Sequence, residues 1–530
     1  MEPVTPRSAS ADPEPPAGPT DAEPGLANAG HPEPPAAPTT AGAVEPAGDG
    51  SGAGRERAAQ AVVDLVAAAL AGAAPKGSLV VVNPSPFERT GLVLADLPET
   101  RARLVDAAGS PVPLQRLGLA PTLLDETVMD DLRPFLGRIH GRELHGHEIV
   151  SWDAADGVFT VTVGRHASGH YSYEDLRRAI LEAEPGFWVV RTVAQPVVTV
   201  AALVTVPPLG RAVLTSRSPA PAGPAAVAHP LRVDPYGFDP VLDNGLLRVC
   251  VAGDGTLSLR AADGTEVHGV GRVVHGGDAG DTCTHAPPPI DRLLDRPADV
   301  SVEEICSGPL TGVYEIVRAY DRPAAIGGGT ERSGGAERSG GGDVRTVVTT
   351  RVELRAGEPY ARCEISMDVR CRDHRVRWHA PLPRAAAESR TEGRFAEGRR
   401  GLTAGDGDGD GGRAGERPIP VFPAESFAAA GGLAVLLDHV GECEITGNGT
   451  EMAVTLVRPA GHLSGNRNPC LDEPAGPETP APAALCQGPL PVRLAVLPYA
   501  GAWREAGLPR LVEEFRHDLL AVPGSGAGGP

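Results

Sequence analysis

Two aspartates lie in a glycine-rich stretch, HGGDAGDTCTHAPPP, at residues 275–289. Asp278 and Asp281 are close enough in sequence for their carboxylates to act as an acid and a base, or to bind sugar hydroxyls. The glycines let backbone approach a ligand closely. The alternative is a surface loop with solvated acids, and this stretch alone does not decide between the two interpretations.

Three other polar stretches have spacings that suit chemistry. HLSGNRNP, at 462–469, offers Arg467 and the asparagine after it as hydrogen-bond donors to a sugar, or it is an ordinary loop. HGRELHGHE, at 140–148, places two histidines on one side of a strand, which suits zinc, but a solvated histidine cluster is favoured. GDGDGDGG, at 405–412, matches the start of a calcium loop, but Arg417 occupies the position of the final glutamate, which favours a flexible acidic linker.

Composition narrows the classes of function. The 530 residues carry a net charge of −20, so neither nucleic acid nor an anionic membrane is expected as a partner. No window of 18 uninterrupted apolar residues and no secretory signal pattern occurs, and GxSxG and P-loop motifs are absent. The eight cysteines include no CxxC pair. We therefore expect reduced thiols and a cytoplasmic location.

The order of patterns along the chain predicts its organisation. Residues 1–54 are rich in proline and acids, which predicts a disordered tail, and residues 55–75 predict one amphipathic helix. From there the patterns are mostly those of strands. ARCEISMDVRCR, at 361–372, alternates apolar with polar and charged residues, as in a half-buried strand, and Asp-Gly at 254–255 predicts a hairpin.

Runs of short strands with Gly and Pro turns predict a mainly β protein built of sandwiches. A short helix within 173–184 is expected to interrupt the strands. Low-complexity insertions at 326–343 and 384–418, and the last residues, 523–530, are expected to be disordered.

Several of these segments, taken in order, resemble the C-terminal region of family 38 glycoside hydrolases, the α-mannosidases. The resemblance covers about residues 55–522. It rests on VVNPSPFERTG (81–91), LVTVPPLGRAVL (203–214), LDNGLLRVCVAGDGTLSLRAADGTEV (242–267), GGDAGDTCTHAPP (276–288), RDHRVRWHAPLP (372–383), GGLAVLLDHVGECEI (431–445) and MAVTLVRPAGHLS (452–464).

The resemblance implies two stacked β-sandwich domains: a small one over 78–225 and a large one, a galactose-mutarotase-like supersandwich, over 226–522. It also implies that the helix at 55–75 resembles the end of a helical bundle. The family's N-terminal catalytic barrel holds zinc with His and Asp side chains and carries an Asp nucleophile. Here the proline-rich tail stands in that place, and no His-x-Asp triplet occurs. We therefore expect no catalytic residue, metal ligand or cofactor in this chain, and zinc only in the missing catalytic domain.

The resemblance implies a non-catalytic C-terminal portion of an α-mannosidase-type glycoside hydrolase, inactive alone, from a truncated or split gene or a relic. Because the family's C-terminal loops help to build the sugar site, it assigns Asp278 and Asp281 to substrate binding. Cys283 stands where the family commonly has a tyrosine, whose stacking and hydrogen bonding a thiol does not reproduce. Arg467 is the fourth candidate.

The expected ligand is a mannose-containing glycan, and the expected protein partner is a separate catalytic barrel chain or a second copy of this chain. The alternative function is a stand-alone carbohydrate-binding or assembly module that works with a separate catalytic chain. A third interpretation is an epimerase of the mutarotase type, for which His275, His285 and Asp281 form the one compact set in the sequence.

Overall fold

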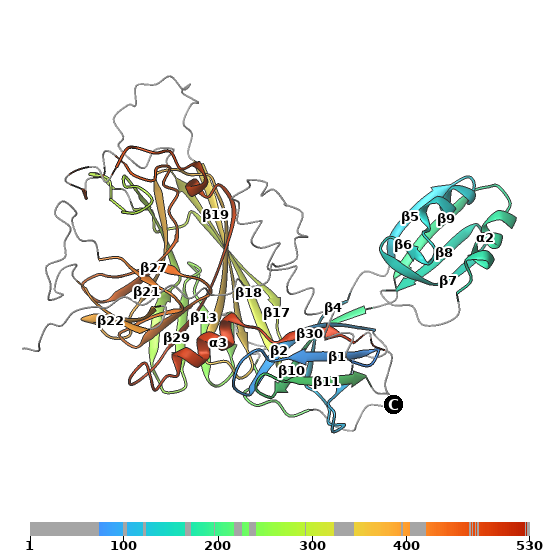
Figure 1. Ribbon diagram of the computed structural model, residues 1–530, viewed down its shortest axis with the longest axis horizontal. Coiled ribbons are helices and arrows are strands. Elements are labelled where there is room, and N and C mark those ends of the chain that lie inside the picture. The colour runs from blue at the N-terminus through green and yellow to red at the C-terminus, as the bar shows by residue number, and fades with distance from the viewer. Residues whose placement is uncertain are drawn as a thin grey trace, which may run out of the picture. The chain divides into compact units, whose positions relative to one another are not determined.

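The structure is a computed structural model whose described part is mainly β (Figure 1). The tail at 1–54, residues 55–73 of the expected helix and the insertion at 326–343 lie outside the described residues. Among the described residues, no helix is both long enough and apolar enough to cross a bilayer. The described residues are 74–98, 103–119, 123–164, 171–194, 197–216, 225–232, 240–291, 293–322, 344–393, 396–402, 420–465, 468, 470–471, 473, 476–524 and 526.

A small β-sandwich is formed by residues near both ends of the described chain. One sheet has the strand order β3-β11-β1-β30 and the other has the order β2-β10-β4. Their Val and Leu side chains alternate inward and form one buried core. The strands are β1 (Ser78–Val82), β2 (Arg89–Pro98), β3 (Leu104–Val105), β4 (Leu114–Leu119), β10 (Val197–Val206), β11 (Arg211–Ser216) and β30 (Leu520–Pro523).

Between β4 and β10 the chain forms a unit of a different class, with its own core around Phe135, Phe159 and Leu176. Its sheet has the order β5-β9-β8-β7-β6, and β8 and β9 pair in parallel because α2 connects them. The Ser172 side chain caps α2, which confirms the helix expected within 173–184. The elements are β5 (Leu123–Met129), η2 (Arg133–Arg138), β6 (Glu143–Leu144), β7 (His147–Ala155), β8 (Val158–Gly164), α2 (Tyr173–Glu182) and β9 (Trp188–Ala194).

The large sandwich packs three sheets around one core (Figure 1). The first sheet, in spatial order, contains β12 (Val241–Asp243), β13 (Leu247–Val251), β14 (Leu257–Ala261) and β15 (Glu266–Val270). The second contains β16 (Arg272–Gly277), β21 (His374–Pro381), β28 (Glu451–Val457), β27 (Gly441–Thr446) and β24 (Phe422–Ala424). The third contains β17 (Asp299–Cys306), β18 (Thr311–Arg322), β19 (Val344–Arg355), β20 (Ala361–Val369), β29 (Gly488–Pro498), β26 (Leu433–Leu437), β25 (Phe427–Ala430), β22 (Glu388–Gly393) and β23 (Ala396–Gly401).

The clearest sequence patterns form the elements they predict. In β20, Cys363, Ile365 and Met367 are buried while the residues between them are exposed, as the alternation predicts. The predicted hairpin joins β13 to β14, with Gly255 at a φ of 80° in the left-handed region. The insertion expected over 384–418 differs, because β22 and β23 form a paired hairpin there. Residues 403–419 lie outside the described residues.

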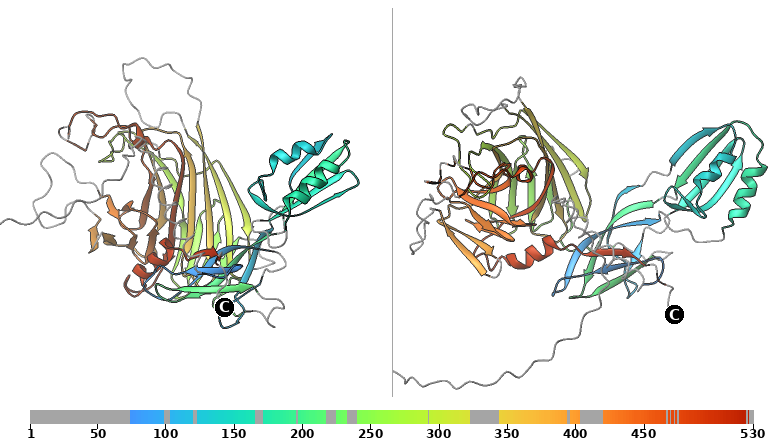
Figure 2. Two further views of the ribbon diagram at one scale, coloured as in Figure 1. Left: turned by 45° about the vertical axis from the view of Figure 1, so that its right-hand side comes forward. Right: turned by 45° about the horizontal axis from the view of Figure 1, so that its top comes forward.

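The loop from Asn83 to Arg89 connects β1 to β2 and contacts α3 (Leu508–Arg516). α3 in turn packs against β26 of the nine-stranded sheet (Figure 2). Arg89 donates from Nη2 to the backbone carbonyl of Glu514 at 2.8 Å and from Nη1 to that of His517. These carbonyls lie at the C-terminal end of α3, where a cation is stabilising. The short helix η3 (Pro482–Leu485) precedes β29.

Candidate functional site

The five-stranded sheet of the large sandwich has one apolar and one charged face. Val376 and Trp378 of β21 point into the core, and because strand side chains alternate, Arg375 and Arg377 lie on the opposite face. On β27, Cys443 belongs to the core, and the glutamates on either side of it lie with the arginines. The charged face is therefore a direct product of period-two patterning.

Ion pairs connect the strands across this charged face. Arg377 Nη1 donates to Glu444 Oε2 at 2.7 Å, and Arg375 Nη2 donates to Glu442 Oε1 at 2.7 Å. Thr455 on β28, between the two strands, donates to the same Glu442 oxygen at 2.6 Å. Burial alone would raise the pKa of Glu442, but Arg375 and the other donors hold it below its ordinary value. Glu442 is thus fixed as a carboxylate.

His285 lies over Arg375, from the loop that follows β16. Its Nδ1 is 3.3 Å from Arg375 Nη1. A guanidinium only donates, so Nδ1 accepts and Nε2 carries the ring proton. Burial, together with the positive charges of Arg375 and Arg458, lowers the pKa of His285 from 6.5 to about 3. The ring is therefore a neutral donor at physiological pH.

Asp278 is buried in the framework of this loop. Its Oδ2 accepts from Arg458 Nε at 2.8 Å, and its Oδ1 accepts from the backbone N–H groups of Gly280 and Ala286 at 3.0 and 3.2 Å. Only 3% of the residue is exposed. Asp278 holds two parts of the loop together and fixes them to the residue that follows β28.

Asp281 holds the other half of the loop. Its Oδ1 accepts from the N–H groups of Cys283 and Thr284, and its Oδ2 accepts from Gly465 N and the Asn468 side chain. Burial would raise the pKa of Asp281, but these donors lower it below the ordinary value. Asp281 is therefore a carboxylate at neutral pH and a poor general acid.

The tightness of the loop depends on Gly280. A Cβ atom at this position would lie 1.9 Å from the Thr284 carbonyl oxygen, a contact that no side chain tolerates. Gly280 thus lets the chain between the two aspartates fold back on itself.

Of the four predicted substrate-binding residues, the three that the structure describes do not line the nearby cavity. Asp278 and Asp281 are buried beside it, Cys283 is exposed, and Arg467 falls outside the described residues. The Cys283 thiol is 3.8 Å from the carbonyl oxygen of Leu463 in the neighbouring segment. Their role in binding substrate stays a prediction.

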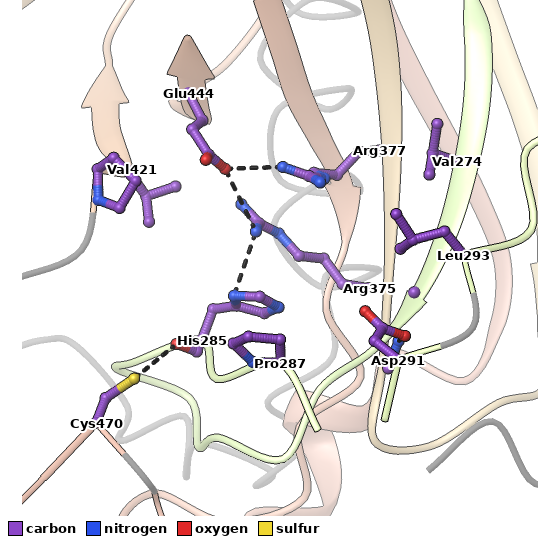
Figure 3. A pocket seen from close by; sticks show the side chains of 13 residues that line it. Val274, His285, Pro287, Asp291, Leu293, Arg375, Arg377, Val421, Glu444 and Cys470 are labelled. Carbon is purple, nitrogen blue, oxygen red and sulfur yellow. Dashed lines mark hydrogen bonds and ion pairs between the residues drawn. The ribbon is translucent and has the colours of Figure 1, made fainter. Parts of the chain in front are cut away.

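A cavity of about 300 Å³ lies between the loop and the charged face (Figure 3). Arg375, Arg377 and Glu444 form part of its wall from β21 and β27, and His285 and Asp291 approach it from the loop and the segment after it. The register places Arg375 opposite Gly276 and Arg377 opposite Val274 on β16, so these two β16 residues also line the cavity.

Glycines on β16 allow Asp291 to reach this wall. Asp291 Oδ1 accepts from the Gly277 N–H at 2.9 Å, and a Cβ at Gly276 would lie 3.2 Å from Oδ2 of the same carboxylate. The sequence interpretation missed Asp291, Arg375, Arg377 and Glu444. The signal was present in RDHRVRWHAP, where charged residues alternate with core residues and therefore share one face.

The other chemical candidates do not converge. His275 lies on β16 between Val274 and Gly276, hence on the face opposite to the cavity, where its ring packs 4.7 Å from that of Tyr320. The epimerase set of His275, His285 and Asp281 is thus divided between the two faces. The calcium-like stretch at 405–412 lies outside the described residues.

The residues of the site do not fit zinc. Zinc is bound by imidazole nitrogens, thiolates and carboxylate oxygens. Here His285 Nδ1 accepts from Arg375, Glu444 is paired with Arg377, and the two guanidiniums of the wall would repel the ion. In the HGRELHGHE stretch, His147 Nδ1 is bonded to the His145 carbonyl at 2.9 Å. Within the described residues, no group of three or more His, Cys, Asp or Glu side chains is placed to hold a metal ion.

Comparison with known proteins gives a likeness in fold. The fold resembles about half of an α-mannosidase. An alpha-mannosidase from Enterococcus faecalis V583 matches with a TM-score of 0.55 and 15% identity over 89% of this chain and 49% of that chain. A protein in glycosyl hydrolase family 38 from Enterococcus faecalis matches with a TM-score of 0.55 and 14% identity over 88% of this chain and 50% of that chain. No protein-family model and no curated protein matches.

These likenesses confirm the expected mainly β fold with sandwich domains. The chain spans about half the length of the solved structures it matches. At this level of identity the likeness concerns architecture, and activity has to be argued from the site.

Proposed function

We propose that this chain is the C-terminal β-sandwich part of a mannoside-processing glycoside hydrolase of the family 38 type, and that it contributes to glycan binding without performing hydrolysis. The observation that carries the proposal is the coverage. The fold of 89% of this chain follows a solved alpha-mannosidase, while the match accounts for 49% of that larger chain.

The carboxylates of the site support a non-catalytic role. Glycoside hydrolysis uses a protonated acid with a raised pKa and a second carboxylate that attacks the sugar or activates water. Here Asp281 and Glu442 have lowered pKa values, and Asp278 and Glu444 are paired with arginines. Such groups orient and bind, and they are poorly suited to deliver a proton.

The proposal assigns the attacking carboxylate and the zinc ion to a catalytic barrel outside these 530 residues. The complete assembly would act on a mannose-containing glycan, with this chain providing the β framework beside the barrel. All eight cysteines are free in the structure, which is in keeping with a reducing cytoplasm.

Two measurements on the full purified chain test the proposal. The chain alone is expected to leave an aryl α-mannoside intact, and on a glycan array it is expected to retain α-mannosyl glycans in preference to β-galactosyl glycans. Turnover that a chelator abolishes would show that this chain is itself catalytic. Equal or weaker retention of α-mannosyl glycans would contradict the mannoside assignment.

A further inference from the structure

The charges that line the cavity beside β16 and β21 balance. Arg375 and Arg377 supply two positive charges, and Asp291 and Glu444 supply two negative charges. His285 adds none, because burial and the nearby arginines lower its pKa to about 3. A cavity with balanced charges offers no net attraction to a phosphate or a carboxylate. It offers strong donors and acceptors to a neutral ligand that carries both kinds of group.

Some polar atoms of the wall remain available after the internal pairs are made. Arg377 donates to Glu444 from Nη1, which leaves Nε and Nη2 as donors on the same guanidinium. Asp291 accepts the Gly277 N–H at Oδ1, which leaves Oδ2 as an acceptor at the wall. His285 contributes the Nε2 proton. Donors on Arg377 and His285 and an acceptor on Asp291 thus belong to side chains that line one small cavity (Figure 3).

We propose that this cavity binds a single neutral sugar ring, with Asp291 accepting from adjacent hydroxyls and Arg377 and His285 donating to others. Each sugar hydroxyl both donates and accepts, so a wall that offers both kinds of group matches it. Val274, Leu293 and Val421 provide apolar surface for the C–H groups of the ring. The volume of about 300 Å³ is at the lower end for ligand cavities, which suits one ring rather than an extended chain.

The neutral sugar site deepens the proposed function, and its identification as a mannoside site rests on that function. The cavity would hold a non-reacting unit of the glycan, since its carboxylates are engaged by arginines or by backbone. Binding energy from such remote units helps to orient a substrate at the reacting centre.

Saturation-transfer NMR on the full chain tests the site, with methyl α-mannopyranoside, methyl β-galactopyranoside and inorganic phosphate as separate probes. We expect the mannoside to bind. Val421→Trp, which fills the cavity without removing an ion pair, should abolish that signal. Val440→Trp is the matched control, because Val440 is half exposed and does not line the cavity. It should leave binding unchanged.

Asp291→Asn provides a second, isosteric test that keeps the acceptor for Gly277. It should weaken mannoside binding about ten-fold, as expected when a charge-assisted hydrogen bond is lost. Asp295→Asn is the control, since Asp295 pairs with Arg272 and does not line the cavity. It should stay within about two-fold of the parent protein.

The possible outcomes distinguish a failure of the neutral sugar site from a failure of the proposed function. Glycan binding that survives Val421→Trp would overturn the cavity assignment while leaving the α-mannosidase relationship intact. Galactoside binding that Val421→Trp abolishes, with no mannoside binding, would support the neutral sugar site and contradict the mannoside role. Phosphate binding at the cavity would overturn the argument from charge balance.

Discussion

Two loops of this chain combine charged residues with prolines, but only one of them has a cavity beside it. In the first, 83–89, Arg89 caps α3, and the guanidinium of Arg510 lies 4.7 Å above the Phe87 ring, so the neighbouring helix covers the loop. In the second, 278–287, the aspartates are equally engaged, but a cavity remains beside His285. Buried polar groups alone therefore do not mark a site, and the difference lies in whether adjoining chain fills the space.

The largest loss of stability is expected when the ion pair between Arg458 and Asp278 of the second loop is broken. Arg458→Leu would leave the buried Asp278 carboxylate without its cation and should lower the free energy of unfolding by about 3–5 kcal/mol. Urea unfolding followed by tryptophan fluorescence measures it. Arg370→Leu, at a largely exposed pair with Asp368, should change it by less than about 1 kcal/mol. Equal losses of stability in the two variants would show that the buried pair contributes no more than the exposed pair.

Arg89 of the first loop is expected to contribute less to stability than Arg458, because Arg89 contacts carbonyl groups rather than a carboxylate. Arg89→Leu should cost about 2 kcal/mol through the loss of its charged hydrogen bonds at the end of α3. Urea unfolding and limited proteolysis near residue 517 are the measurements. Arg177→Leu on exposed α2 is the control. A loss as large as that of Arg458→Leu would contradict this ranking.

The pH dependence of stability should distinguish His285 from exposed histidines. Because its pKa is about 3 in the folded protein and 6.5 ordinarily, only the unfolded chain takes up this proton as the pH falls from 6.5 towards 3. Stability is therefore lost over that window, by at most about 1.4 kcal/mol per pH unit, and is unaffected above it. His285→Gln lacks this loss, so the difference between the two proteins should shift in favour of the variant at acidic pH.

Urea unfolding at several pH values measures this difference. His268→Gln is the control, because His268 is largely exposed. A difference between the parent protein and His285→Gln that does not vary with pH would show that the His285 ring takes up its proton as readily in the folded protein as in the unfolded chain.

The smallest expected effect concerns the exposed thiol at the tip of the second loop. Cys283→Ser should change the free energy of unfolding by less than about 0.5 kcal/mol. In thiol labelling of the folded protein, Cys283 and Cys486 should react quickly. Cys363 and Cys443 should not, because burial raises the pKa of both thiols to about 12. Slow labelling of Cys283 would show that its thiol is buried in the folded protein.

Local patterns in the sequence were sufficient for much of the fold. The alternation in β20 and the Asp-Gly turn before β14 depend on neighbours in the chain, so the sequence predicts them directly. The hairpin of β22 and β23 was missed because half of its strand residues are charged and the segment has no local apolar pattern. β22 also pairs with β25, which is distant in the chain. The unit around α2 was missed because its parallel pairing joins strands separated by a helix.

The cavity depends on contacts that the sequence does not display. Arg377 and Glu444 are far apart in the chain, and they meet because β28 sets the register between β21 and β27. Asp278 and Asp281 were correctly singled out as unusual, but the sequence does not show that backbone N–H groups and Arg458 already engage them. Whether these carboxylate oxygens are free for a ligand or already bonded within the protein depends on the folded structure, which brings residues distant in the chain together.

The pairing of β1 also has a consequence for biosynthesis. β1 lies between β11 and β30, with Leu79 opposite Pro523. The first strand of the described chain therefore completes its pairing only with the last described strand. On the ribosome, one edge of β1 stays open until residues 520–523 have emerged. An open strand edge invites pairing with other chains, and sequence-distant pairing is slow. The nascent protein therefore has a long interval in which chaperones would need to protect its amino-terminal sheet.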